Sequence, residues 1–336
     1  MFFKDKKVLI IGGTGTIGKK ILENILLEEP KEVRIFSRDE SKHFNLVNNL
    51  TSSQKKIANF FIGDVRDFRR VSEVMKGIDY VFHTAAMKHV TYCEFSPLEA
   101  VLNNIIGTYN VINSAVNENV KKVVITSTDK AISPSNVYGA TKLIAERMVQ
   151  GLNRQGKEST TIFSVVRFGN VLGSRGSVIP LFISQILKDK KITVTDYSMT
   201  RFMMTLEQAA LLTIKALKEA SGGEVFILKM PVVSLKDLVS VILDETCKKH
   251  NMKKQDIYIE EIGLRPGEKM YEELMTIEES RIALELKDMF MIPSYNLVNI
   301  GTQVNNTKPS NYSSQNQEPI SREELRKMIL QENLIQ

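Results

Sequence analysis

The chain has 336 residues, 43% of them hydrophobic and 25% charged, which is the composition of an ordinary globular protein. Its net charge is +6 without a long basic block, so we expect anionic small molecules and no nucleic acid as ligands. Cys93, Cys247 and four scattered histidines provide neither a disulfide framework nor the spacing of a metal site. No apolar run reaches the ~20 residues of a membrane span, and a strand begins almost at once, leaving no signal peptide. We therefore expect a cytoplasmic protein with no membrane attachment.

A glycine-rich loop follows the first predicted strand, Val8–Ile11, and precedes a helix predicted over Lys19–Glu29. Glycines allow a tight turn and let backbone N–H groups approach a pyrophosphate at the helix N-terminus. In this context G-x-x-G-x-x-G predicts a dinucleotide site. The residues that we assign to it here are Gly12, Thr14, Gly15, Thr16, Ile17 and Gly18.

The end of the second predicted strand, Val33–Phe36, bears on the choice of cofactor. An acidic residue usually stands there in NAD enzymes and binds the ribose hydroxyls. Here Ser37 and Arg38 come first and Lys42 adds a cation, and a guanidinium can fork onto the oxygens of a 2′-phosphate. We expect NADP, while Asp39 keeps NAD open.

Later strand ends extend the predicted cofactor site. Asp64 would hold the adenine, the small residues Thr84–Ala86 would let a strand pass close to the cofactor, and Lys88 would reach the nicotinamide ribose or the substrate. An exposed loop lysine is an equal alternative for Lys88. The cofactor residues from these regions are Asp64, Val65, Thr84, Ala85, Ala86, Lys88 and Val171.

The chemistry is predicted in Ser127–Lys130 and Tyr138–Lys142, which follow the buried strand Val123–Thr126. Open α/β sheets bind ligands at the carboxyl ends of their strands. Tyr138 and Lys142 are four residues apart and so share one face of a helix. A nearby ammonium lowers the pKa of a phenol, so the pair could take a proton from a sugar hydroxyl while hydride leaves for a nicotinamide.

The predicted fold class is α/β, a Rossmann doubly wound parallel sheet with a smaller C-terminal substrate-binding domain. Residues 1–170 and about 206–249 are assigned to the cofactor domain, and about 171–205 and 250–336 to the substrate domain. A long helix is predicted over Pro97–Asn119, with Asn104 as a structural bridge, and with the Tyr138 helix it could form a dimer bundle. Asn299–Pro319 is expected to be a loosely held loop, and Ser321–Glu324 is a capping box that opens the last helix.

Together these motifs resemble the extended short-chain dehydrogenase/reductase family over nearly the whole chain. Within that family, several segments are similar to the bacterial UDP-N-acetylglucosamine 4,6-dehydratases, which are CapD-like polysaccharide biosynthesis proteins. Those segments are Ser127-Thr-Asp-Lys-Ala131, Ser174-Arg-Gly-Ser-Val-Ile-Pro180, Met199-Thr-Arg-Phe202 and Arg265-Pro-Gly-Glu-Lys269. Several subgroups carry methionine at position 138, and tyrosine there resembles the soluble, C5-inverting enzymes that begin pseudaminic acid synthesis.

The resemblance implies a mechanism and a set of roles. Tyr138, supported by Lys142, takes the proton of the 4-hydroxyl, and Thr128 binds the 4-oxygen. Lys130 is the expected base at carbon 5 and Asp129 the acid for the 6-hydroxyl, although the two roles may be swapped or shared. The residues expected to bind the UDP-sugar are Lys88, Thr128, Asn170, Val178, Arg201, Arg265 and Glu268.

Each of these roles makes a demand on a pKa. Lys130 must be partly neutral near pH 7, for which we expect burial and neighbouring cations to act. Asp129 must begin protonated, which requires burial or a nearby negative charge.

Several alternatives remain open. A UDP-hexose or UDP-N-acetylhexosamine 4-epimerase needs the same cofactor and the same Tyr138–Lys142 pair. Other variants are a dehydratase that stops at the 5,6-ene and one that retains the configuration at carbon 5. A catalytically silent NADP-sensing protein is the alternative outside the enzymes. We expect a homo-oligomer, either a dimer or a hexamer.

Overall fold

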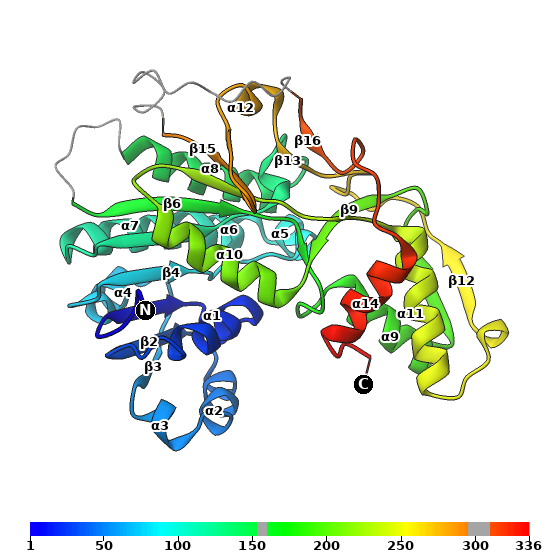
Figure 1. The fold of residues 1–336 in the computed structure, drawn as a ribbon, viewed down its shortest axis with the longest axis horizontal. Helices are drawn as coiled ribbons and strands as arrows, with labels where there is room; N and C mark the ends of the chain where they lie inside the picture. Colours follow the sequence, from blue (N-terminus) through cyan, green and yellow to red (C-terminus); the bar gives the residue numbers. More distant parts are fainter. Residues whose placement is uncertain (153–159, 295–309, 336) are drawn as a thin grey trace.

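A sheet of nine strands forms the centre of the computed structural model, which describes residues 1–152, 160–294 and 310–335 (Figure 1). Its order is β14-β15-β10-β6-β5-β4-β1-β2-β3. All neighbouring pairs from β3 to β10 are parallel, whereas β15 and β14 are added antiparallel at one edge. The strands are β1 (Lys7–Ile11), β2 (Glu32–Ser37), β3 (Ala58–Ile62), β4 (Tyr80–His83), β5 (Lys122–Thr126), β6 (Ile162–Arg167), β10 (Val225–Leu228), β14 (Leu284–Glu285) and β15 (Met289–Ile292). The order 3-2-1-4-5-6 confirms the predicted Rossmann fold.

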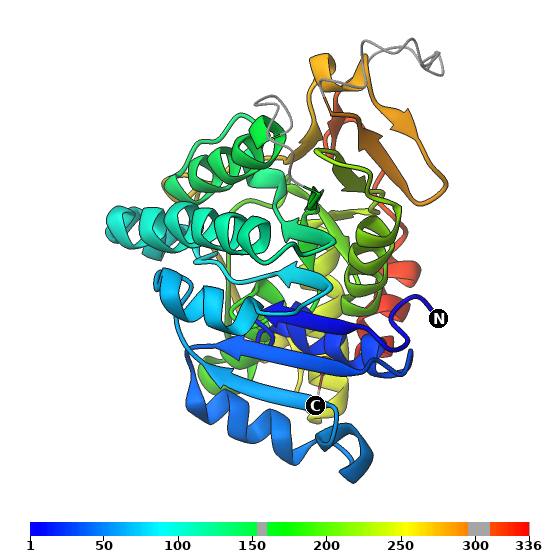
Figure 2. The ribbon, with the colours of Figure 1, turned by 90° about the vertical axis from the view of Figure 1, so that its left-hand side faces the viewer.

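Helices cover both faces of this sheet, as the side view in Figure 2 shows. On one face α1 (Thr16–Leu26) packs against α10 (Leu206–Glu219), and on the other α4 (Phe68–Met75) and α8 (Val137–Leu152) flank α7 (Gly107–Asn117). Shorter helices complete this part of the chain: α2 (Glu40–Asn48), α3 (Ser52–Lys55), α5 (Val90–Phe95) and α6 (Pro97–Val101).

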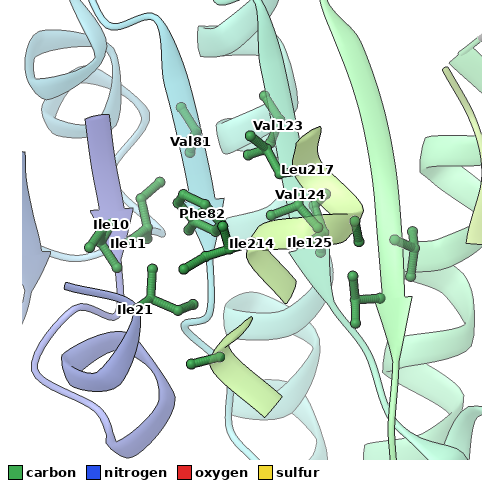
Figure 3. Close-up of a cluster of buried hydrophobic side chains, with 14 of the residues drawn as sticks. Ile10, Ile11, Ile21, Val81, Phe82, Val123, Val124, Ile125, Ile214 and Leu217 are labelled. Carbon is green, nitrogen blue, oxygen red and sulfur yellow. The ribbon is translucent and has the colours of Figure 1, made fainter. Parts of the chain in front are cut away.

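The main core lies between the parallel strands and these helices. Figure 3 shows Ile10, Phe82 and Val124 from three adjacent strands beside Ile21 of α1 and Leu217 of α10. All of these side chains are fully buried. The β-branched runs read from the sequence are therefore central strands, covered on both faces.

A second core lies beyond the carboxyl ends of the strands, at the right of Figure 1. It is built from α9 (Val178–Asp189), α11 (Leu235–Lys249) and α14 (Arg322–Gln331), beside the strand pair β8 (Lys191–Val194) and β12 (Tyr258–Glu261). The remaining elements are β7 (Asn170–Val171), β9 (Thr200–Met204), β11 (Val232–Ser234), η3 (Lys254–Asp256), β13 (Glu273–Met275), α12 (Ile277–Ser280) and β16 (Tyr312–Ser313).

The packing follows a different division from the predicted one. Helix α11, assigned to the cofactor domain, contributes Leu238 and Ile242 to the second core. Leu274 and Met289, assigned to the substrate domain, are buried in the main core. The two parts interlock, and the predicted domain boundaries stay a prediction.

Two predicted segments differ from the observed ones. The helix expected over Pro97–Asn119 contains a π-helical turn, η1 (Leu102–Ile106), between α6 and α7. Of the loop expected over Asn299–Pro319, residues 299–309 lie outside the described residues, while 310–319 contain β16, which pairs with β13. The expectation of a loosely held loop is wrong for that part, because Ser313 and Ser314 are buried and hydrogen-bonded. The capping box of the last helix is confirmed, with Ser321 and Glu324 bonded reciprocally.

Candidate active site

A cavity of about 610 Å³ opens at the carboxyl ends of β1, β4, β5 and β6. Both the glycine loop and the predicted catalytic residues line it. A second cavity of about 450 Å³ continues from it past the end of β2. The residues that line both are Gly15, Arg38, Lys42, Thr84, Ala86 and Arg175. The two cavities together form an elongated site with room for a dinucleotide and a second ligand.

The glycine loop has the geometry of a phosphate cradle. Gly12 has a φ of +83°, and a Cβ there would lie 2.7 Å from both the Ala85 nitrogen and the Thr84 Oγ1. A Cβ on Gly18 would lie 2.5 Å from the Gly12 oxygen. Helix α1 begins directly after Gly15 without a side-chain cap, so its first N–H groups remain available to an anion. These features fit a dinucleotide diphosphate.

The adenosine end gathers three cations. Arg38, which is largely exposed, and Lys42, which pairs with Asp39 at 2.5 Å, stand where the sequence predicts them. Asp39 also caps α2, and Lys42 and the more distant Arg175 lower the pKa of its carboxyl. Arg175 was missed by sequence reasoning, since the motif signal lay in the glycines on either side of it, Gly173 and Gly176.

Two other predicted cofactor residues, Ser37 and Asp64, contact side chains of the protein itself. The Ser37 hydroxyl lies 2.8 Å from the Thr14 Oγ1 and 2.9 Å from the Nε2 of His43, a buried residue that the sequence did not point to. Asp64 is ion-paired with Arg66 at 2.7 Å and does not line either cavity, whereas its neighbour Val65 does.

The acid–base residues follow β5 in a 3-10 turn, η2 (Asp129–Ala131). Asp129 is 1% exposed, and its Oδ1 accepts hydrogen bonds from the Thr128 Oγ1 at 2.9 Å and the Lys130 Nζ at 3.1 Å. Lys130 also pairs with the Glu272 Oε1 at 3.0 Å. Glu272 is a buried carboxylate far along the chain, and no local pattern distinguishes it from the adjacent Glu273.

The electrostatics of Lys130 correct one expectation. Burial opposes the ammonium charge, but Asp129 and Glu272 outweigh it and raise the pKa of Lys130 above its ordinary value. The expectation that neighbouring cations make this amine partly neutral is wrong for this state of the protein, because its closest charged partners are two carboxylates. Burial in turn raises the pKa of Glu272.

Tyr138 and Lys142 both line the cavity from α8. Burial raises the pKa of Tyr138 to about 12, although a hydrogen bond to Thr128 and the charge of Lys130 act in the opposite direction. The expected lowering of this pKa is therefore wrong here, since burial outweighs the hydrogen bond and the charge of Lys130. Burial lowers the pKa of Lys142 to about 8, with Glu146 acting in the opposite direction.

Asn104 forms the structural bridge that the sequence predicts. Its amide oxygen accepts from the Met87 nitrogen at 2.8 Å, and its amide nitrogen donates to the Met87 oxygen and the Thr141 Oγ1, both at 3.0 Å. It lies in the π-helical turn η1. The bridge ties the loop after β4 to the helix that carries Tyr138.

The predicted substrate residues separate into two groups. Lys88, Thr128 and Asn170 line the main cavity, and Lys88 lies 3.4 Å from the Ser174 Oγ. Burial, with the nearby Arg175, lowers the pKa of Lys88. The other four, Val178, Arg201, Arg265 and Glu268, do not line it.

These four residues have other surroundings. Val178 begins α9 and packs against the second core. The Arg201 guanidinium donates to the carbonyls of Thr200, Lys269 and Met270. Arg265 is exposed, and its backbone N–H donates to Glu268 at 3.4 Å. Arg265 and Glu268 belong to one loop, in which the Lys269 Nζ donates to the carbonyls of Ile132 and Ser133.

Comparisons with known proteins place this geometry in a family. A family model described as a polysaccharide biosynthesis protein matches residues 8–294. The chain is 45% identical, over 98% of its length and 96% of the other, to a Methanocaldococcus jannaschii protein named "Uncharacterized membrane protein MJ1061". It is 38% identical to the UDP-glucose 4-epimerase of Rickettsia rickettsii, over 99% of this chain and 98% of that one. The X-ray structure of Pen from Bacillus thuringiensis is 57% identical with a TM-score of 0.94, covering 100% of both chains.

Within the three described ranges, no helix has both the length and the apolar character needed to cross a bilayer. The family match spans the parallel sheet, the glycine loop and the cavity residues from Asp129 to Lys142. The expected resemblance is confirmed at this level: the chain belongs to the polysaccharide biosynthesis protein family and has the Rossmann fold of the extended short-chain dehydrogenases/reductases.

Proposed function

We propose that this protein is an NADP-dependent nucleotide-sugar enzyme that removes water from UDP-N-acetylglucosamine across carbons 5 and 6, with inversion at carbon 5. The observation that carries the proposal is the acid–base pair Asp129–Lys130 beside Tyr138 and Lys142 in one cavity. Oxidation and reduction at carbon 4 need only a tyrosine, a lysine and a nicotinamide. A second acid–base pair is required when a hydroxyl must also leave.

The cofactor proposal rests on the cradle and on the cations at the end of β2. Gly12, Gly15 and the start of α1 would hold the diphosphate, and Arg38, Lys42 and Arg175 would hold a 2′-phosphate. A nicotinamide held there would supply a reversible hydride acceptor for the sugar within one turnover. Since Asp39 is already paired with Lys42, it is less available to ribose hydroxyls, which favours NADP over NAD.

The residues of the chain supply the proton transfers. Tyr138 accepts the proton of the 4-hydroxyl, and the charge of a bound nicotinamide would add to that of Lys130 in lowering the tyrosine pKa from about 12. The 4-ketone then acidifies the carbon 5 proton, which passes to Lys130. The 6-hydroxyl leaves as water with a proton from the buried pair, for which Asp129 is placed. A proton returns to carbon 5 from the opposite face.

The substrate proposal draws on the charge of the site and on the relatives. Lys88 places positive charge in the cavity that also holds the catalytic groups, where a diphosphate would lie. UDP-glucose is the substrate named for the Rickettsia relative. We propose a UDP-sugar for this chain also, in the synthesis of a bacterial surface or flagellar glycan.

A 4-epimerase is the second candidate, and the 38% identity to a UDP-glucose 4-epimerase over 99% of the chain favours it. It would use Tyr138 and Lys142 in the same way and leave carbon 5 untouched. The Asp129–Lys130–Glu272 cluster would then have no part in the chemistry, although its burial carries a cost in free energy.

One experiment decides between them. The protein is incubated with UDP-N-acetylglucosamine in heavy water, with and without NADP+, and the product is analysed by mass spectrometry and NMR. Loss of water with deuterium at carbon 5 is the expected result. A product of unchanged mass with an axial 4-hydroxyl would establish the epimerase, an unsaturated product would establish the 5,6-ene variant, and an unaltered substrate would contradict an enzyme acting on this sugar.

A further inference from the structure

Glu272 is a buried carboxylate held in place by its own backbone. It directly precedes β13, is 2% exposed, and donates its N–H to the Ser314 Oγ at 3.0 Å. The Ser314 N–H donates to the Glu272 carbonyl at 2.9 Å. Its Oε1 lies 3.0 Å from the Nζ of Lys130, so the β13–β16 pair places this carboxylate behind the acid–base turn.

Each of the two carboxylates around Lys130 has one oxygen paired with the lysine and one oxygen without a hydrogen bond among the described residues. The Asp129 Oδ1 and the Glu272 Oε1 pair with the ammonium, whereas the Asp129 Oδ2 and the Glu272 Oε2 are buried without a hydrogen-bond partner in the described part of the chain. A buried carboxylate oxygen without a donor is costly, and a proton on the carboxyl reduces that cost. Two such groups on one lysine therefore form a cluster that can take up and pass on a proton.

We propose that Glu272 is the positioning residue of the acid–base pair: it holds the Lys130 ammonium beside Asp129 and receives its proton when the amine must act as a base. This inference rests on the proposed dehydration. It adds to that reaction a second carboxylate in contact with Lys130. Glu272 does not line the cavity and therefore acts through Lys130.

The proton and electron balance of the step closes within the cluster. One N–H bond of Lys130 breaks and an O–H bond forms on Glu272. The free amine then takes the proton from carbon 5, and the electrons of that C–H bond become the bond between carbons 5 and 6. The 6-hydroxyl leaves with the electrons of its C–O bond and takes a proton from Asp129, so that one proton enters the cluster and one leaves it.

The surroundings set the direction of the expected pH effect. Asp129, Tyr138 and Arg201 are the other charged or titratable groups that act on Lys130 or Glu272. Burial raises the pKa of Glu272, and Asp129 adds to this, while Lys130 and Arg201 oppose it. Removing the Glu272 charge takes away one of the two carboxylates that stabilise the Lys130 ammonium, so the pKa of Lys130 must fall.

The test compares Glu272→Gln with Glu272→Asp and with the matched control Glu273→Gln. Glu273 is the next residue, is half-buried, and accepts from the Asn311 amide at 2.9 Å on the other side of the strand. For each full-length variant with NADP+, three quantities are measured: the pH profile of kcat/KM for water loss, the single-turnover rate of hydride transfer, and the pH midpoint for labelling of Lys130 by an amine reagent. Thermal unfolding checks that each variant is folded.

In Glu272→Gln we expect the acidic limb of the profile and the Lys130 labelling midpoint to move down by at least about one pH unit. We expect kcat for water loss to fall about tenfold or more, with KM and hydride transfer within about twofold of wild type. Glu272→Asp should restore part of the midpoint, and Glu273→Gln should leave all three quantities unchanged.

Two results would overturn the inference: an unchanged limb and labelling midpoint in Glu272→Gln, or an equal loss of water release and hydride transfer, as a purely structural role predicts. If Glu272→Gln does not fold, the same shift measured in Glu272→Asp decides. A wild-type protein that releases no water contradicts the proposed function instead. The labelling midpoints then still decide whether Glu272 controls the proton on Lys130.

Discussion

The two ends of the active-site cavity are built in different ways. At the cofactor end, Gly12 and Gly15 lie in the turn between β1 and α1 and Gly18 lies in the first turn of α1, so the backbone of one continuous segment forms the cradle. At the acid–base end, Lys130 from the turn after β5 meets Glu272 from the strand pair near the C-terminus. The first end depends on local backbone geometry, and the second on the docking of segments far apart in the sequence.

A buried arginine also joins segments that are far apart in the sequence. Arg167 of β6 is buried and pairs with Glu146 of α8 at 2.6 Å and with Glu279 of α12 at 2.9 Å. It also donates to the Leu274 carbonyl in β13 at 2.8 Å. One guanidinium thus ties the catalytic helix and the segment that carries Glu272 to the central sheet. Changes at either end of the cavity should therefore have distinguishable consequences.

The largest effect is expected at the acid–base end. Lys130→Ala removes the proposed base, so water loss should fall roughly 10²- to 10⁴-fold, and solvent deuterium should no longer enter carbon 5. Reduction of NADP+ by the substrate, followed by the absorbance of the reduced nicotinamide, should remain measurable because Tyr138 and Lys142 are intact. Tyr138→Phe is the contrasting variant and should abolish both. Normal turnover in Lys130→Ala would remove this lysine from the mechanism.

A comparable effect on stability is expected from Arg167→Met. The substitution leaves Glu146 buried without its cation, and breaking a buried pair on one side costs about 3–5 kcal/mol. Chemical denaturation should show this loss in the free energy of unfolding. The control is Arg147→Met, on the exposed side of α8, the helix that carries Glu146. The Arg147 side chain contacts Gln150, and its replacement should change the free energy of unfolding by no more than about 0.5 kcal/mol. Equal losses in the two variants would contradict the proposed tie.

A smaller and more selective effect is expected at the cofactor end. Arg175→Ala removes one of three cations near the proposed 2′-phosphate, and a charge-assisted hydrogen bond contributes about 1.5–3 kcal/mol. The dissociation constant for NADP+ should rise about 10- to 100-fold, while that for NAD+ changes by less than about threefold, as measured by calorimetry. Tighter binding of NAD+ than NADP+ by the wild-type protein would refute the cofactor preference outright.

The smallest effect concerns the loop of residues 263–270. Arg265 is exposed and does not line the cavity, so a contact with the UDP-sugar would be made outside the cavity. Arg265→Ala should raise KM for the UDP-sugar about tenfold, roughly the 1.4 kcal/mol of one exposed charge-assisted contact, and leave kcat unchanged. An unchanged KM would place the diphosphate site elsewhere, with Lys88 as the next cation to test.

The sequence by itself determined the parallel part of the sheet, the glycine cradle and the positions of Asp129, Lys130, Tyr138 and Lys142. These features have local signals: β-branched runs, glycines between a strand and a helix, and two residues one helical turn apart. Strand, loop and helix geometry depends mainly on neighbouring residues, which is why the printed order of residues is enough to predict it.

The tertiary structure decided which charges surround those groups. Glu272 beside Lys130, Arg175 in the same cavity as Asp39 and the burial of Tyr138 each arise from the packing of distant segments, and each changed an expected pKa or added a residue to the site. Burial and the distance to a partner charge govern a pKa, and both are properties of the packed chain. A sequence motif can therefore name the acid and the base, but the folded surroundings decide which of them holds the proton.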